Sequence, residues 1–280
     1  MSYVLPALAL VALLAGFGSP VVARIAPVAP AEVTIIARDY AFEAPDTIPA
    51  GVTSIRMRDR GKEQHHWVLF RLADSVSLEE FYRDMKDGGA SPAGIASLGG
   101  SQDSIAVSLD LATGRYVLGC LHGSPDGTSH LAKGMFRALT VRARRSGDGP
   151  SARAPRVDAT VTMRDYGYSL SGPSLRAGRR TLRLENAGPQ EHHVMLQRLE
   201  PGKSLADVER FFADGRRGPR PMRPVSGGTT RQSVGETLYW TIDVEAGGYL
   251  FLCRVPDAGD ARPHVDHGMR QEIRVLAVAP

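Results

Sequence analysis

The chain has 280 residues, 42% of them hydrophobic and 23% charged, and this balance excludes wholesale disorder. A formal net charge of +4 is too small to indicate a nucleic-acid-binding protein, and two cysteines are too few for a disulfide framework. The 30 glycines and 19 prolines indicate a turn-rich chain, which favours β architecture.

The first segment, residues 1–23, carries no charged side chain and is almost wholly apolar or small. It ends in the small-residue pattern Val21-Val22-Ala23, which is typical of signal-peptide cleavage. We therefore expect a signal peptide and a periplasmic or secreted protein. The alternative is a retained N-terminal anchor, because the segment approaches membrane-spanning length, and we expect membrane contact only in that case.

The remainder of the chain contains one module twice. The matching pairs are Asp39-Tyr40 with Asp165-Tyr166, Ala50-Gly51 with Ala177-Gly178, His65-His66 with His192-His193, Ser77-Leu78 with Ser204-Leu205, Cys120 with Cys253, His130 with His264, and Gly134-Met135 with Gly268-Met269. Their order is kept, and the offset drifts only from 126 to 134 residues. The series predicts two tandem domains, residues 31–144 and 156–278, joined by a linker at residues 145–155.

Each module reads as short strands with one helix. In chain order, the strands expected are 32–37, 53–57, 66–71, 114–120 and a last one after Gly134-Met135, then 159–163, 181–184, 193–198, 248–253 and a last one after Gly268-Met269. Ser77 with Glu80, and Ser204 with Asp207, predict a capping box at the start of each helix. The pattern predicts an all-β fold, a sandwich or barrel with a short inserted helix in each domain.

Each module also presents His, Cys, His and Met in the same order. The candidates are His65 or His66, Cys120, His130 and Met135, then His192 or His193, Cys253, His264 and Met269. A thiolate, two imidazoles and a weak thioether suit a mononuclear type 1 copper site. The alternatives are that both cysteines are core residues, or that Cys120 and Cys253 form a disulfide. His122 and His267 lack a counterpart in the other module, and we exclude both from the ligand set.

At these residues the sequence resembles the cupredoxin family, the small blue copper proteins, over both modules. His65-His66-Trp67-Val68-Leu69 is similar to the strand that carries the family's first ligand, and the His-x4-Met pairs are similar to its closing loop. The resemblance implies two tandem Greek-key sandwiches or barrels and makes His65 and His192 ligands. It places His66 and His193 where the family usually has Asn. It also implies that His130 and His264 expose their ring edges, through which electrons enter or leave.

These residues favour an exported electron-transfer protein with one copper, cycling between Cu(I) and Cu(II), in each domain, and with a redox partner protein. The alternatives are a periplasmic copper chaperone or storage protein, and a metal-free cupredoxin-like structural or binding module. We expect no enzyme, since multicopper oxidases and nitrite reductases need a His before the Cys. Gly119 precedes Cys120, Leu252 precedes Cys253, and the chain has no His-x-His pair.

Overall fold

The computed structural model of the protein describes residues 31–86, 94–98, 106–148, 153–172, 174–229 and 231–278. The expected signal segment and part of the expected linker lie outside these residues. Among the described residues, no helix has the length and apolar character needed to cross a membrane.

The first module is a sandwich of two sheet layers. Its elements are β1 (Ala31–Arg38), β2 (Ala41–Glu43), β3 (Thr47–Pro49), β4 (Gly51–Asp59), β5 (Trp67–Arg71), α1 (Leu78–Lys86), β6 (Gly94–Leu98), β7 (Ala106–Leu111), β8 (Gly114–Gly119) and β9 (Phe136–Arg142). One layer has the order β2-β1-β4-β7 and the other β3-β9-β8-β5-β6. Alternate residues of β4 (Thr53, Ile55 and Met57) are buried, as the period of two in a strand requires.

The second module repeats this plan. After the short 3-10 turn η1 (Ser146–Asp148), its elements are β10 (Ala159–Arg164), β11 (Gly167–Ser171), β12 (Gly178–Asn186), β13 (Met195–Leu199), α2 (Leu205–Ala213), β14 (Met222–Gly228), β15 (Thr237–Val244), β16 (Gly247–Leu252), η2 (His264–His267) and β17 (Arg270–Val275). Its layers are β11-β10-β12-β15 and β14-β13-β16-β17.

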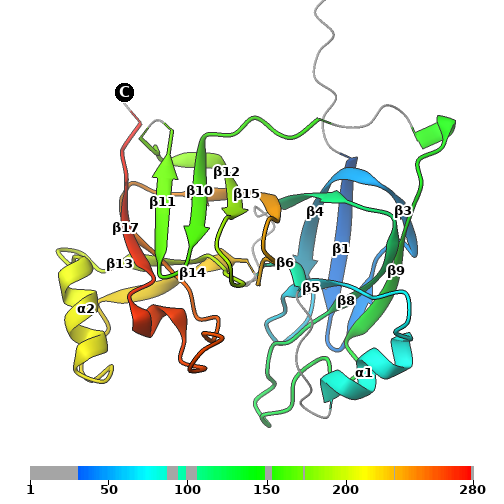
Figure 1. Ribbon diagram of the computed structural model, residues 1–280, viewed down its shortest axis with the longest axis horizontal. Coiled ribbons are helices and arrows are strands. Elements are labelled where there is room, and N and C mark those ends of the chain that lie inside the picture. Colours follow the sequence, from blue (N-terminus) through cyan, green and yellow to red (C-terminus); the bar gives the residue numbers. More distant parts are fainter. Residues whose placement is uncertain are drawn as a thin grey trace, which may run out of the picture.

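The helices begin where the sequence predicts. The backbone N–H of Glu80 donates to the hydroxyl of Ser77 at 3.1 Å, and the N–H of Ser77 donates back to the carboxylate of Glu80 at 2.8 Å. In the second module the N–H of Ser204 donates to the carboxylate of Asp207 at 3.0 Å. The two helices lie at opposite ends of the molecule, away from the junction of the modules (Figure 1).

The modules are joined by a sheet as well as by the linker. β7 pairs antiparallel with β15, with Val107 opposite Trp240, so one layer from each module forms a continuous eight-stranded sheet. Val107 and Trp240 are fully buried and belong to one hydrophobic cluster that includes residues of both modules. The all-β prediction is therefore confirmed, and the boundaries 31–144 and 156–278 stay predictions.

Candidate metal centres

The ends of strands position the predicted ligands. Cys120 directly follows β8 and Cys253 directly follows β16, while His65 and His192 lie shortly before β5 and β13. On β8 the side chains of Tyr116 and Leu118 are buried on the same face as Cys120, because successive side chains alternate. All eight predicted ligand residues are fully buried, at 0% exposure: His65, Cys120, His130, Met135, His192, Cys253, His264 and Met269.

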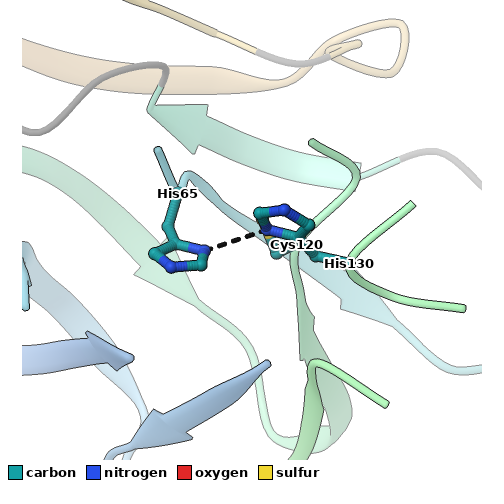
Figure 2. Close-up of side chains that lie close together, drawn as sticks. All are labelled: His65, Cys120 and His130. Carbon is teal, nitrogen blue, oxygen red and sulfur yellow. Dashed lines mark hydrogen bonds between the residues drawn. The ribbon is translucent and has the colours of Figure 1, made fainter. Parts of the chain in front are cut away.

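In the first module, three of these side chains converge. Nδ1 of His65 lies 3.0 Å from Nδ1 of His130, which lies 3.5 Å from Sγ of Cys120. Figure 2 shows the two imidazole rings turned toward each other, with Cys120 beside them. The three ligand atoms all lie within 4.8 Å of one another, which is close enough to bind one ion.

The second module has nearly the same geometry. Nδ1 of His192 lies 3.1 Å from Nδ1 of His264, and Sγ of Cys253 lies 3.5 Å from Nδ1 of His264. His192, Cys253 and His264 form a second group with all ligand atoms within 4.8 Å. The sequence pairs that predicted two equivalent centres thus come together in space twice.

The methionines are held beside these groups by backbone hydrogen bonds. The N–H of Met135 donates to the carbonyl of His130 at 2.8 Å, and the N–H of Cys120 donates to the carbonyl of Met135 at 3.1 Å. Met269 makes the equivalent bonds with His264 and Cys253, at 2.9 and 3.2 Å. This tight loop brings the buried thioether to the same region, and its role as an axial ligand stays a prediction.

A carboxylate faces the outer nitrogen of both rings in the first module. Nε2 of His65 lies 3.1 Å from Oδ1 of Asp39, and Nε2 of His130 lies 2.9 Å from Oε2 of Glu63. Backbone N–H groups, chiefly that of Glu63, lower the pKa of Asp39, and the hydroxyl of Tyr40 is the main cause of a lowered pKa at Glu63. Both acids are therefore ionised acceptors, and a neutral imidazole donates to such an acceptor when its proton is on Nε2.

This arrangement fits a metal ion. With Nε2 protonated, each Nδ1 presents a lone pair, and two such lone pairs face each other at 3.0 Å in the first module. The single thiol proton of Cys120 cannot satisfy both rings. A cation between Nδ1, Nδ1 and Sγ would satisfy all three atoms, and one thiolate with two imidazoles is a donor set suited to copper.

Burial disfavours the thiolate form of both candidate ligand cysteines. Burial raises the pKa of Cys120, and it raises the pKa of Cys253 to about 11, while backbone N–H groups next to each sulfur act in the opposite direction. Both cysteines are free and buried, so the disulfide alternative does not occur in this structure. A metal ion bound here would displace a thiol proton, and its affinity would therefore depend on pH.

His66 and His193 tie the two ligand segments together. Nε2 of His66 accepts the backbone N–H of Leu121, and Nε2 of His193 accepts the N–H of Arg254, at 3.2 and 2.7 Å. Burial lowers the pKa of His66 to about 4 and that of His193 to about 3, so both stay neutral. Each links the residue after the first ligand to the residue after the cysteine.

One expectation from the resemblance is wrong. His130 and His264 do not expose their ring edges, since both are fully buried. The ring of Tyr40 stands edge-on to His130 with centroids 5.4 Å apart, and Tyr166 covers His264 in the same way at 5.7 Å. Any electron path to these rings therefore passes through covering side chains.

The two unmatched histidines lie outside the sulfur groups, as expected. The ring of His122 packs edge-on to His130 with centroids 5.6 Å apart. Nε2 of His267 lies 3.1 Å from Asp260, in a third group with Asp257 that contains no cysteine.

The carboxylates and tyrosines around the rings were not predicted. Asp39-Tyr40 and Asp165-Tyr166 are the first pairs of the repeat series, but their repetition alone did not indicate a function for them. Tyr40 and Tyr166 adopt left-handed backbone conformations, with φ of 64° and 63°. Such a conformation is uncommon for a bulky residue. The turn between the first two strands of each module presents an Asp and a Tyr to the two imidazoles.

Comparisons with known proteins found similar chains among solved structures. The sequence matches no model of a protein family, and the search of curated proteins gave no match. Among solved structures, the chain is similar to the auracyanin of Roseiflexus castenholzii, with 19% identity and a TM-score of 0.29 over 43% of this chain and 95% of that one. It is similar to the copper-containing nitrite reductase of Thermus scotoductus, with 13% identity and a TM-score of 0.25 over 90% of this chain and 63% of that one. It is also similar to a multicopper oxidase, with 15% identity and a TM-score of 0.24 over 87% of this chain and 88% of that one.

These likenesses concern the fold alone, and in this structure each β-sandwich module holds a His-Cys-His group. They also correct one expectation. The exclusion of an enzyme was wrong, because enzymes are among the proteins with similar two-domain folds, and the fold is compatible with enzymatic activity. The chain lacks the His-Cys dipeptide, and this argues against one way of linking two copper centres. It does not argue against every reaction.

Proposed function

We propose that the protein binds one copper ion in each module through a type 1-like site and transfers electrons. The observation that carries the proposal is the facing pair of Nδ1 atoms beside a buried sulfur, repeated in both halves. Copper bound there would supply a Cu(I)/Cu(II) couple. The ligands would be His65, Cys120, His130 and Met135 in the first module and His192, Cys253, His264 and Met269 in the second.

The surroundings of the ligands support transfer of an electron. Rings held at Nε2 by carboxylates, and at their edges by tyrosines, have little freedom to reorient, as an electron carrier requires of its site. Complete burial of the ligands keeps solvent out of the site. Residues 1–23 support the further proposal that the protein is exported, and an electron carrier requires a redox partner protein.

Copper reconstitution tests the proposal. Purified protein is titrated with Cu(II), and bound copper and the intense visible thiolate-to-copper absorption are measured together. We expect two equivalents and the band. Cys120→Ser and Cys253→Ser should each remove one equivalent and that site's share of the absorption, and the double variant should remove both.

Two other outcomes would favour the alternatives. Tight binding of Cu(I) without a stable coloured Cu(II) form would indicate a copper chaperone or storage protein. Absence of copper binding in a folded protein would indicate a structural or binding module and would refute the proposal. Reversible reduction and reoxidation of the coloured protein separates the carrier from the chaperone.

A further inference from the structure

The two centres differ in the group that holds the second imidazole. In the first module, a carboxylate oxygen of Glu63 lies 2.9 Å from Nε2 of His130. At the equivalent position the second module has Gln190, whose neutral Oε1 lies 3.4 Å from Nε2 of His264. The first imidazole of each module has the same kind of partner, since Nε2 of His65 faces Asp39 and Nε2 of His192 faces Asp165.

A carboxylate is present in the second module too, but it is set back. Asp257 takes the place of Ser124, and its nearest oxygen lies 3.6 Å from Nε2 of His264. The side-chain amide of Gln190 donates to Asp257 at 2.9 Å, and the hydroxyl of Tyr166 donates to it at 2.6 Å. The backbone N–H of Gly259 donates to it as well, at 2.7 Å, so three donors bind this carboxylate.

Charge near a ligand ring acts differently on the two oxidation states. Cu(II) carries one more positive charge than Cu(I), so a carboxylate hydrogen-bonded to a ligand imidazole stabilises Cu(II) more. The direct contact of Glu63 therefore favours Cu(II) in the first module. A neutral amide and a more distant carboxylate favour Cu(II) less in the second module.

Arginines around the second centre act in the same direction. Arg254 follows Cys253 and Arg270 follows Met269, where the first module has Leu121 and Phe136. Positive side chains near a centre disfavour the more highly charged ion. Arg254 is exposed, so solvent screens part of its effect.

From these differences we infer that Glu63 sets a lower reduction potential in the first module than Gln190 allows in the second, so that an electron shared by the two centres resides on the second. The inference rests on the proposed copper sites. The inference assigns a direction to electron transfer between the modules: the first centre donates the electron and the second accepts it.

Full-length protein with a single intact centre tests the inference. Cys253→Ser isolates the first centre and Cys120→Ser the second, and each potential is measured by spectroelectrochemistry of the visible band. We expect the second potential to be higher. Glu63→Gln in the Cys253→Ser protein should lower the ratio of Cu(II) to Cu(I) affinity by about tenfold, the lower end of outer-shell effects, which equals a rise of about 59 mV for one electron.

Exchanging the two outer residues between the modules makes the test stricter. Glu63→Gln with Ser124→Asp gives the first centre the outer groups of the second, and Gln190→Glu with Asp257→Ser does the reverse. We expect the first double variant to raise the potential of its centre and the second to lower that of its own. Glu43→Gln is the matched control, since Glu43 is an exposed acid of the same module paired with Arg38.

A readout without redox chemistry complements the potentials. Zn²⁺ and Ag⁺ differ in charge as Cu(II) and Cu(I) do, and isothermal titration gives their affinities for the single-centre proteins. Glu63→Gln should weaken Zn²⁺ binding more than Ag⁺ binding. Equal or reversed potentials in coloured, copper-loaded centres, or potentials that the exchanges leave unchanged, would overturn the inference. Absence of copper or of the band would instead overturn the proposed function.

Discussion

Replacement of Gly61 by alanine is a direct test of how tightly the outer shell holds the first centre. Gly61 lies in the turn after β4, where its N–H donates to Asp59 at 3.0 Å. A Cβ atom at this position would lie 2.2 Å from Nε2 of His65 and 2.5 Å from Oδ1 of Asp39. The methyl group would therefore occupy the contact between the imidazole and the carboxylate that holds it.

The size of the effect follows from the overlap. A separation of 2.2 Å is more than 1 Å short of ordinary van der Waals contact, so the ring, the acid or the turn must move. Overpacking of a buried site costs about 1–3 kcal/mol, and loss of an outer-shell partner costs about 10–100-fold in metal affinity. Gly188, the counterpart of Gly61, is less crowded, at 2.7 Å from Nε2 of His192, and its replacement should cost less.

The assay measures copper affinity and the free energy of unfolding of Gly61→Ala in the Cys253→Ser protein. Gly123→Ala is the control, because a Cβ atom there would meet nothing within 4 Å. We expect weaker copper binding and lower stability for Gly61→Ala and neither change for the control. If Gly61→Ala binds copper with unchanged affinity and unfolds like the parent, the imidazole–carboxylate contact does not hold the ligand as we argue.

Three further predictions concern the fold. Trp240→Ala, at the buried junction of β15 with β7, should cost about 3–5 kcal/mol and lower the stability of both modules, as measured by urea unfolding and hydrogen exchange; an effect confined to the second module would contradict a shared core. Burial raises the pKa of Glu236, so its contribution to stability is present below the unfolded-state pKa and is lost as pH rises through the folded-state pKa; Glu236→Gln should flatten this part of the pH profile of unfolding, and an unchanged slope would refute it. Ser77→Ala should lower stability by about 1 kcal/mol through loss of the helix cap, and no change in the urea midpoint would speak against it.

Local pattern was sufficient for most elements. Strands such as β1 and β8 alternate or run apolar between turn residues, and the serine-acid pairs fix where both helices begin. β7 and β15 are not among the strands predicted from the sequence, and their pairing joins segments far apart in the chain. β7 is buried at almost every position and β15 alternates buried with half-buried or exposed residues, and neither pattern indicates which strand is the neighbour.

The inner site was predictable for a different reason. A single buried His or Met is most simply explained as a core residue. The recurrence of His, Cys, His and Met in the same order in both modules distinguished the candidate ligands from the other histidines. The exposure of His130 and His264 was predicted wrongly because it came from the resemblance. In this chain, Tyr40 and Glu63 cover His130, and neither residue contributes to the ligand pattern.

The outer shell shows why comparison of the two modules position by position was not enough. At the positions of Glu63 and Ser124 the second module has Gln190 and Asp257, so the acid has moved between two segments that are distant in sequence. In space they are neighbours: Tyr40 donates to Glu63 and Tyr166 donates to Asp257, so each tyrosine keeps a carboxylate. Both modules therefore provide an acceptor for Nε2 that leaves Nδ1 bare, Glu63 in the first and Gln190 in the second. Only the carboxylate comes from a different part of the chain in each. A comparison of equivalent positions shows only that an acid is lost, whereas the structure shows a carboxylate displaced to 3.6 Å from Nε2 of His264. The lower preference for Cu(II) that we infer for the second centre rests on this distance.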